Sequence, residues 1–285
     1  MSIEHIELSP GYPVIEIKHP AVTARVALHG AHLMEWTPAG REPVLYLSPD
    51  AIYQKGKAIR GGVPVCWPWF GPHESDGAMP AHGVARNRFW TLEKAEESAD
   101  GVKLLFILTD DAATRALWPH AFRLEYEMTL GAELRLSLRM QNPGTEAFKV
   151  TGALHSYFRV GDIRQVGVAG LAGAVYLDHA EGDAVRTETG EVRFNGEVDS
   201  DYLTSEPVTV IDPAMGRKFA IQSTGSGCTV VWNPWLDKAR RLTDLPDEDY
   251  RKFVCVETAN AWRDRITVEP GGTHELAARI QVTSP

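Results

Sequence analysis

A strict alternation of apolar and polar residues between positions 122 and 140 constrains the fold most. Over 122–130 every second residue is Phe, Leu, Tyr or Met, with charged residues or threonine between them. The alternation resumes over 134–140, after Gly131-Ala132. A period of two places alternate side chains on opposite faces of a strand, and two such runs joined by a short Gly-containing link indicate a hairpin. We therefore expect an antiparallel β-hairpin with one buried and one solvent-facing side.

Short apolar runs separated by turn signals extend this pattern over most of the chain. Turn sequences such as Asn-Pro-Gly at 142–144 separate several runs, and helical spacing is confined to 111–117 and 247–252. No repeat or low-complexity linker divides the chain. We therefore predict an all-β fold, a large antiparallel β-sandwich with few short helices, as a single domain over 1–285. Further strands are expected at 13–18, 22–28, 102–108, 148–160, 207–211, 229–232, 252–257 and 274–282.

Charge and composition narrow the classes of partner. The net charge of −9 disfavours a general surface for nucleic acid or anionic membranes, although clustered arginines can still bind a small anion. Nothing approaches the roughly 20 consecutive apolar residues of a membrane span. We expect a small-molecule ligand, no nucleic-acid or membrane partner, and a monomer, because no heptad or long apolar helix indicates obligate assembly.

The N-terminus and the cysteines bear on the compartment. The opening sequence MSIEHIELSPG has neither the basic nor the apolar region of a signal peptide. Cys66, Cys228 and Cys255 are widely spaced, odd in number and free of C-x-x-C pairing. They indicate buried thiols in a reducing compartment rather than a disulfide framework or a zinc site. We therefore expect a cytoplasmic protein.

The stretch IRGGVPVCWPWFGPH, residues 59–73, gathers prolines and aromatic rings beside one cation. Its prolines disfavour a regular strand, and its aromatics disfavour a disordered linker. We expect Trp67, Trp69 and Phe70 to stack on the apolar faces of a sugar ring. The alternative is that these rings fill the core beneath an irregular loop.

Two arginines lie in similar glycine-containing surroundings. Arg60 precedes Gly61-Gly62, where the backbone can approach a ligand closely, and Arg86 lies in PAHGVARNRFW. Two fork-shaped guanidinium groups can hold a phosphate bidentately. The alternative is a pair of surface arginines in ordinary salt bridges.

His155 and Glu257 are candidates for proton transfer. His155 lies in the strand-like run GALHSYFRV, where it shares a face with Tyr157, and Glu257 ends the apolar run in KFVCVETAN. Histidine titrates near neutral pH, and a carboxylate in an apolar run is costly to bury unless it is paired. The two residues would form an acid and a base only in a β fold that joins distant strands. The alternatives are a structural histidine and an edge carboxylate that reaches water.

Other chemistries have weaker support. His29, His32, His73 and His82 lack the spacing that forces metal ligands to converge, so we expect no metal. No G-x-S-x-G, Walker or G-x-G-x-x-G motif is present, which disfavours serine hydrolases, NTPases and Rossmann enzymes. Glycoside cleavage stays open, because Asp199, Asp201 and Glu257 can approach one another.

Taken together, five motifs resemble the glucose-6-phosphate 1-epimerase family, the hexose-6-phosphate mutarotases of the galactose-mutarotase-like superfamily. They occur in the family's order, from about residue 51 to residue 261, and VEPGGTHELAARI fits its final strand pair. As a set they are specific, whereas each alone is weak. The motifs are AIRGGVPVCWPWFGPH, PAHGVARNRFW, GALHSYFRV, VVWNPW and FVCVETAN.

The resemblance implies a β-sandwich enzyme that interconverts α and β anomers of a hexose 6-phosphate without a cofactor. It further implies specific roles by motif: catalysis by His155 and Glu257, phosphate binding by Arg60 and Arg86, and sugar binding by His82 and Asp199. The chain departs from the family with Ser200 for arginine and Val84 for phenylalanine, and the first departure bears on the preferred hexose. The alternatives are a non-catalytic carbohydrate-binding protein and an aldose 1-epimerase acting on unphosphorylated sugars.

Overall fold

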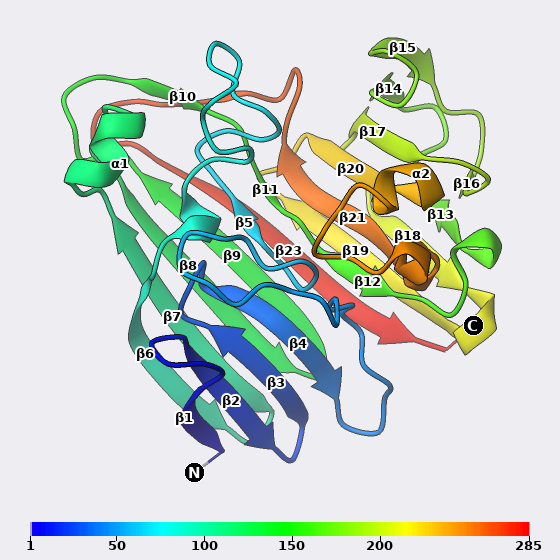
Figure 1. Ribbon diagram of the computed structural model, residues 1–285, viewed down its shortest axis with the longest axis horizontal. Helices are drawn as coiled ribbons and strands as arrows, with labels where there is room; N and C mark the ends of the chain where they lie inside the picture. The colour runs from blue at the N-terminus through cyan, green and yellow to red at the C-terminus, as the bar shows by residue number, and fades with distance from the viewer. Residues whose placement is uncertain (1, 285) are drawn as a thin grey trace.

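Extended antiparallel sheets dominate the computed structural model, which describes residues 2–284 (Figure 1). One layer is a nine-stranded sheet in the order β16-β13-β18-β19-β23-β9-β8-β7-β6. Its strands are β6 (Thr91–Ser98), β7 (Gly101–Thr109), β8 (Arg123–Gly131), β9 (Glu133–Gln141), β13 (Gly167–Ala169), β16 (Val192–Arg193), β18 (Val208–Asp212), β19 (Arg217–Thr224) and β23 (Thr273–Thr283).

The other layer carries an eight-stranded sheet in the order β15-β14-β17-β20-β21-β11-β5, with β12 also paired to β21. Its strands are β5 (Val65–Cys66), β11 (Gly152–Leu154), β12 (Tyr157–Arg159), β14 (Val175–Asp178), β15 (Ala184–Thr187), β17 (Val198–Leu203), β20 (Cys228–Asn233) and β21 (Phe253–Asn260). Smaller sheets are formed by β1 (Ile3–Glu7), β2 (Pro13–His19), β3 (Val22–Ala27) and β4 (His32–Pro38), and by β10 (Phe148–Val150) with β22 (Ile266–Val268).

The expected hairpin is confirmed as β8 and β9. Tyr126 lies opposite Leu138 and Met128 opposite Leu136, and all four side chains are buried. Their apolar faces join one hydrophobic core that reaches from β2 to β23. The predicted all-β sandwich is therefore correct, because alternation along each strand gives each sheet one apolar face to bury.

Helices are short. The expected helix at 111–117 is α1 (Ala112–Leu117), which Asp111 caps, and the expected one at 247–252 is the 3₁₀ segment η4 (Asp247–Lys252). Among residues 2–284, no helix is long and apolar enough to span a membrane. The remaining helices are α2 (Trp235–Ala239), η1 (Ala85–Asn87), η2 (Ile163–Gln165) and η3 (Pro213–Met215).

The expected single strand at 148–160 is wrong. The chain first pairs with β22 as β10, and then changes partner to lie between β5 and β21 as β11. The pairing with β21 stops at Leu154 and resumes at Tyr157 on β12; in between, the Ser156 N–H donates to the carbonyl of Leu154. Pairing with three distant segments divides a run that looks continuous in the sequence.

Candidate active site

A cavity of about 810 Å³ opens on the eight-stranded sheet. Strand register explains which side chains reach it. Asp201 on β17, Val230 on β20 and Glu257 on β21 are paired across the three strands, so they form one row on one face. All three residues line the cavity. Neighbouring positions such as Ser200 face the opposite side, because side chains alternate along a strand.

The cavity gathers most of the site residues expected from the sequence. These residues come from loops far apart in the chain as well as from the sheet. Trp67 is the one expected site residue that does not line the cavity. The expected residues that line the cavity are Arg60, Trp69, Phe70, His82, Arg86, His155, Asp199 and Glu257.

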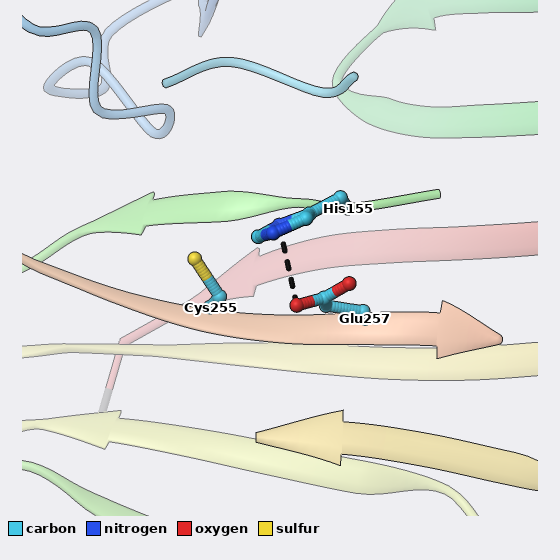
Figure 2. Close-up of side chains that lie close together, drawn as sticks. All are labelled: His155, Cys255 and Glu257. Carbon is cyan, nitrogen blue, oxygen red and sulfur yellow. Dashed lines mark ion pairs between the residues drawn. The ribbon is translucent and has the colours of Figure 1, made fainter. Parts of the chain in front are cut away.

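His155 and Glu257 lie face to face within this cavity (Figure 2). The register that pairs Leu154 with Thr258 and Tyr157 with Cys255 sets His155 opposite Glu257. His155 Nδ1 lies 3.2 Å from Glu257 Oε1. The two side chains are only 8% and 1% exposed. The imidazole also stacks on the Tyr157 ring, with centroids 4.8 Å apart and planes within 7°, so its orientation is fixed.

Burial sets the protonation of this pair. It raises the pKa of Glu257 well above the usual value, and the charges of Asp201 and Asp199 raise it further while Arg86 opposes them. Burial also lowers the pKa of His155, as do His82 and the two arginines. Within residues 2–284, neither Nδ1 of His155 nor Oε2 of Glu257 has a hydrogen-bond partner. The pair therefore holds one proton between two otherwise unpartnered groups that line the cavity.

The two arginines differ in how many of their N–H groups already donate hydrogen bonds within the protein. Arg60 Nε donates to Asp244 Oδ1 at 3.1 Å, and its Nη1 donates to the Tyr157 hydroxyl at 3.0 Å. Arg86 Nη2 donates to the carbonyl of Ala81 at 2.9 Å, but its buried Nε has no partner in the described part of the chain. A buried donor without an acceptor is costly unless a ligand supplies one. Arg86 thus has fewer of its N–H groups committed to protein acceptors than Arg60.

His82 and two aromatic residues form part of the wall. The Gly71 N–H donates to Nδ1 of His82 at 3.2 Å, so the neutral imidazole carries its proton on Nε2 and can donate from there. Burial, Arg86 and Arg60 together lower the pKa of His82, which favours this neutral form. Phe70 packs edge-on to His82, and Trp69 Nε1 donates to the carbonyl of Pro80 at 2.9 Å.

Trp67 does not contribute to the cavity, so its expected sugar contact is wrong. Its side chain is 0% exposed and packs edge-on to Trp118, Phe122 and Phe148 in the core. The sequence reasoning grouped this ring with Trp69 and Phe70 as aromatic walls for a sugar, and for Trp67 the alternative of core packing is the correct one. Its actual place is decided by partners 50 or more residues along the chain, which the local sequence does not reveal.

The expected role of Gly61-Gly62 is also wrong. A Cβ on Gly61 would lie 2.4 Å from the carbonyl oxygen of Tyr46, and one on Gly62 would lie 2.3 Å from that of Leu33. Both glycines have positive φ and are absent from the cavity lining. They permit close packing of backbone segments and do not admit a ligand.

Two cationic residues that the sequence reasoning left without a role, Lys238 and His179, also line the cavity. Lys238 on α2 donates to Asp199 Oδ2 at 2.9 Å and to Glu197 Oε1 at 2.7 Å. His179 Nε2 lies 3.4 Å from Asp201 Oδ2. The alternation of acidic residues at 197, 199 and 201 is the signal that could have assigned these carboxylates to one face of a strand.

One group of potential metal ligands occurs in the described part of the chain. Ligand atoms of His155, Cys255 and Glu257 lie within 4.8 Å of one another (Figure 2). Burial and the Glu257 charge raise the pKa of the Cys255 thiol well above the usual value. A thiol must lose its proton to bind zinc, so the surroundings oppose such a site. His32 is committed elsewhere, to the Gly61 carbonyl. The cysteines are free and buried, as expected.

Comparison with known proteins agrees with this geometry. The profile of the family described as "Aldose 1-epimerase" matches residues 13–281. A protein of Escherichia coli (strain K12) named "Putative glucose-6-phosphate 1-epimerase" is 42% identical over 94% of this chain and 90% of its own length. A protein of the same name from Cenchrus ciliaris is 36% identical over 92% of this chain and 81% of its own.

Solved structures similar to this chain include proteins named as a mutarotase and as an epimerase. The crystal structure of a "putative mutarotase" from Salmonella typhimurium superposes with a TM-score of 0.92 at 36% identity, covering 99% of this chain and 97% of that one. The galactose 1-epimerase of Lactobacillus acidophilus has a TM-score of 0.77 at 13% identity, covering 99% and 98%, and supports the fold alone. The matched residues include both members of the His155–Glu257 pair. The chain therefore belongs to the aldose 1-epimerase family and is an epimerase.

Proposed function

We propose that this epimerase interconverts the α and β anomers of a hexose 6-phosphate, most readily glucose 6-phosphate, without a cofactor. The observation that carries the proposal is the buried contact of 3.2 Å between His155 and Glu257 in a cavity that Arg60 and Arg86 also line. A neutral sugar offers two guanidinium groups nothing anionic to bind, whereas a phosphate does. The names of the relatives from Escherichia coli and Cenchrus ciliaris agree with this substrate.

The reaction needs two proton transfers. Glu257 removes the proton of the C1 hydroxyl, His155 donates a proton to the ring oxygen, and the bond between C1 and the ring oxygen breaks to give the open-chain aldehyde. Rotation about the C1–C2 bond then presents the other face of the carbonyl. Reclosure reverses both transfers, so each residue recovers its starting state and no net proton is consumed.

The single proton on the pair suits this cycle. Glu257 protonated with neutral His155, and ionised Glu257 with protonated His155, contain the same number of protons. Burial favours the first arrangement, and the reaction uses the second. A phosphate dianion bound by Arg60 and Arg86 offsets the positive charges that lower the pKa of His155. The substrate thereby promotes the protonated histidine that it requires.

Exchange NMR between the two anomers of glucose 6-phosphate tests the proposal. Wild-type protein should accelerate exchange above the spontaneous rate, and Glu257→Gln and His155→Ala should each reduce the enzymatic rate about 10²- to 10⁴-fold. Free glucose is the control without phosphate. Acceleration of glucose and glucose 6-phosphate alike would instead favour an epimerase of unphosphorylated sugars.

Variants at the arginines separate binding from chemistry. Arg86→Met should raise KM for glucose 6-phosphate by about 10-fold or more, because a charge-assisted contact to the phosphate is lost. The rate for free glucose should not fall in this variant. An equal loss on both sugars would contradict the phosphate-binding role and leave Arg86 as a structural residue.

A further inference from the structure

Asp201 is a buried carboxylate, and one of its two oxygens accepts no hydrogen bond within residues 2–284. The residue is 3% exposed and lines the cavity. Its Oδ2 faces Nε2 of His179 at 3.4 Å, whereas its Oδ1 has no hydrogen-bond partner among residues 2–284. A buried carboxylate oxygen without a donor is costly, so it indicates a group that arrives from the cavity.

His179 holds this carboxylate in place. Its Nδ1 lies 2.6 Å from Asp183 Oδ1, so both ring nitrogens face carboxylate oxygens. Only the protonated imidazole can donate from both nitrogens. The pKa of His179 is accordingly raised to about 9, chiefly by its contact with Asp201, although burial opposes the shift. One oxygen of Asp201 is therefore held by a cation while the other stays free.

The place of Asp201 in the sheet fits a sugar contact. Asp201 and Glu257 belong to one row across β17, β20 and β21, with Val230 between them. Two strand spacings separate their backbones by about 10 Å. Val230 offers an apolar surface between the two carboxyl groups. A pyranose whose C1 faces Glu257 can therefore extend over Val230 toward Asp201.

We propose that the free oxygen of Asp201 accepts a hydrogen bond from a ring hydroxyl at C2, C3 or C4, and that the Asp201–His179 pair is a second sugar-binding element that selects among hexoses. This inference rests on the proposed function, because it places the anomeric carbon at Glu257. It adds a hydroxyl contact to the one expected of Asp199, whose Oδ2 is held by Lys238.

The test compares glucose 6-phosphate with its 2-deoxy, 3-deoxy and 4-deoxy analogues in wild type and Asp201→Asn. The asparagine keeps the shape but removes the charged acceptor. The variant should lose about 10- to 100-fold in kcat/KM on glucose 6-phosphate. On the analogue that lacks the contacted hydroxyl, the loss should shrink to less than about threefold, because wild type has already lost the contact.

Glu181→Gln is the matched control. Glu181 is a carboxylate in the same link between β14 and β15, but it is exposed and does not line the cavity. Among residues 2–284, the hydrogen bonds and ion pairs of the Asp201–His179 pair do not involve Glu181. This variant should retain wild-type kcat/KM on all four sugars. Asp201→Ala repeats the comparison if Asp201→Asn does not fold.

Two results would overturn the inference: equal losses on all four sugars, or no loss on any. Failure of the proposed function is distinguishable, since wild type would then accelerate exchange of none of these sugars. In that case calorimetric dissociation constants of the same four sugars for wild type and Asp201→Asn decide the contact. Weaker binding restricted to sugars that carry one particular hydroxyl supports it, and uniform binding refutes it.

Discussion

At the scale of single residues, the site depends on how neighbours share charge. Glu257 lies among Asp199 and Asp201, which raise its pKa, and Arg86, which opposes them. His155 lies among cations that lower its pKa. The two shifts favour a protonated Glu257 beside a neutral His155, which together hold one proton. Isolated carboxyl and imidazole groups also hold one proton between about pH 4.3 and 6.5, but there it is on the imidazole.

This arrangement predicts a plateau with an acid and an alkaline limb in the pH profile of kcat. The acid limb begins where the pair gains a second proton, below the lowered pKa of His155, and the alkaline limb begins where it loses its only proton, above the raised pKa of Glu257. Removal of a negative charge near Glu257 favours its ionised form. Asp201→Asn should therefore move the alkaline limb to lower pH, and an unchanged limb would contradict the assignment of that limb to Glu257.

If bound phosphate raises the pKa of His155, inorganic phosphate that is not attached to the sugar should also activate the enzyme. Free glucose should exchange slowly, and inorganic phosphate should accelerate its exchange in a saturable way, by about fivefold or more. The reason is that phosphate offsets the arginine charges that lower the pKa of His155. The measurement is exchange NMR of glucose during a phosphate titration. Arg86→Met is the control, and the same acceleration in that variant would point to a general salt effect.

At the scale of elements, the loops beyond the strands are held by buried polar side chains. Asn233 at the end of β20 is fully buried. Its Nδ2 donates to the carbonyls of Tyr250 and Phe253, and its Oδ1 accepts from the N–H of Trp235. This one amide joins β20 to α2 and η4, and α2 carries Lys238 to the cavity.

Asn233→Ala should therefore lower the free energy of unfolding by about 3 kcal/mol, because two buried carbonyls and one N–H lose their partner. Denaturation in urea measures the change. Asn195→Ala is the comparison, since Asn195 is exposed and its replacement should stay within about 0.5 kcal/mol of wild type. Similar values for the two variants would refute the structural role of Asn233.

Local pattern was enough to predict elements whose partners are near in sequence. The alternation at 122–140 predicts the β8–β9 hairpin, and a single turn joins its strands. The prediction of one strand at 148–160 was wrong because pairing with the distant strands β5, β21 and β22 decides where the run breaks. The prediction for Trp67 was wrong for the same reason, since its core partners are distant in the sequence. The resemblance of the motifs, and not the spacing of the residues, predicted that His155 and Glu257 act together. That resemblance could not reveal the free oxygen of Asp201, which depends on its contacts in the folded chain.

At the scale of the whole molecule, one hydrophobic core connects both layers. Ile15 on β2, Phe158 on β12 and Ile280 on β23 belong to the same buried cluster. Figure 1 shows β23 as one long strand across the middle of the molecule, where it lies between β9 and β19 in the nine-stranded sheet. This shared cluster, which includes residues of both large sheets, couples the stability of one layer to that of the other. We accordingly propose that the chain unfolds as one unit.

Thermal unfolding tests this proposal. Tryptophan fluorescence and far-UV circular dichroism should report the same transition. Glucose 6-phosphate at 100 times its dissociation constant should stabilise the whole molecule by about 2.7 kcal/mol and move both signals together. Two separate transitions, with only one of them moved by the sugar phosphate, would divide the chain into independent parts.

The alternating register of β17 also limits how this protein can evolve. Asp199 and Asp201 both reach the cavity because a single residue, Ser200, lies between them, so their side chains lie on the same face of the sheet. Loss of one residue of β17 ahead of Asp199 would turn Ser200 and Tyr202 toward the cavity and both carboxylates toward the core. We therefore expect changes of sugar preference here to arise by substitution. Insertions and deletions should be tolerated instead in exposed links, such as the one between β14 and β15.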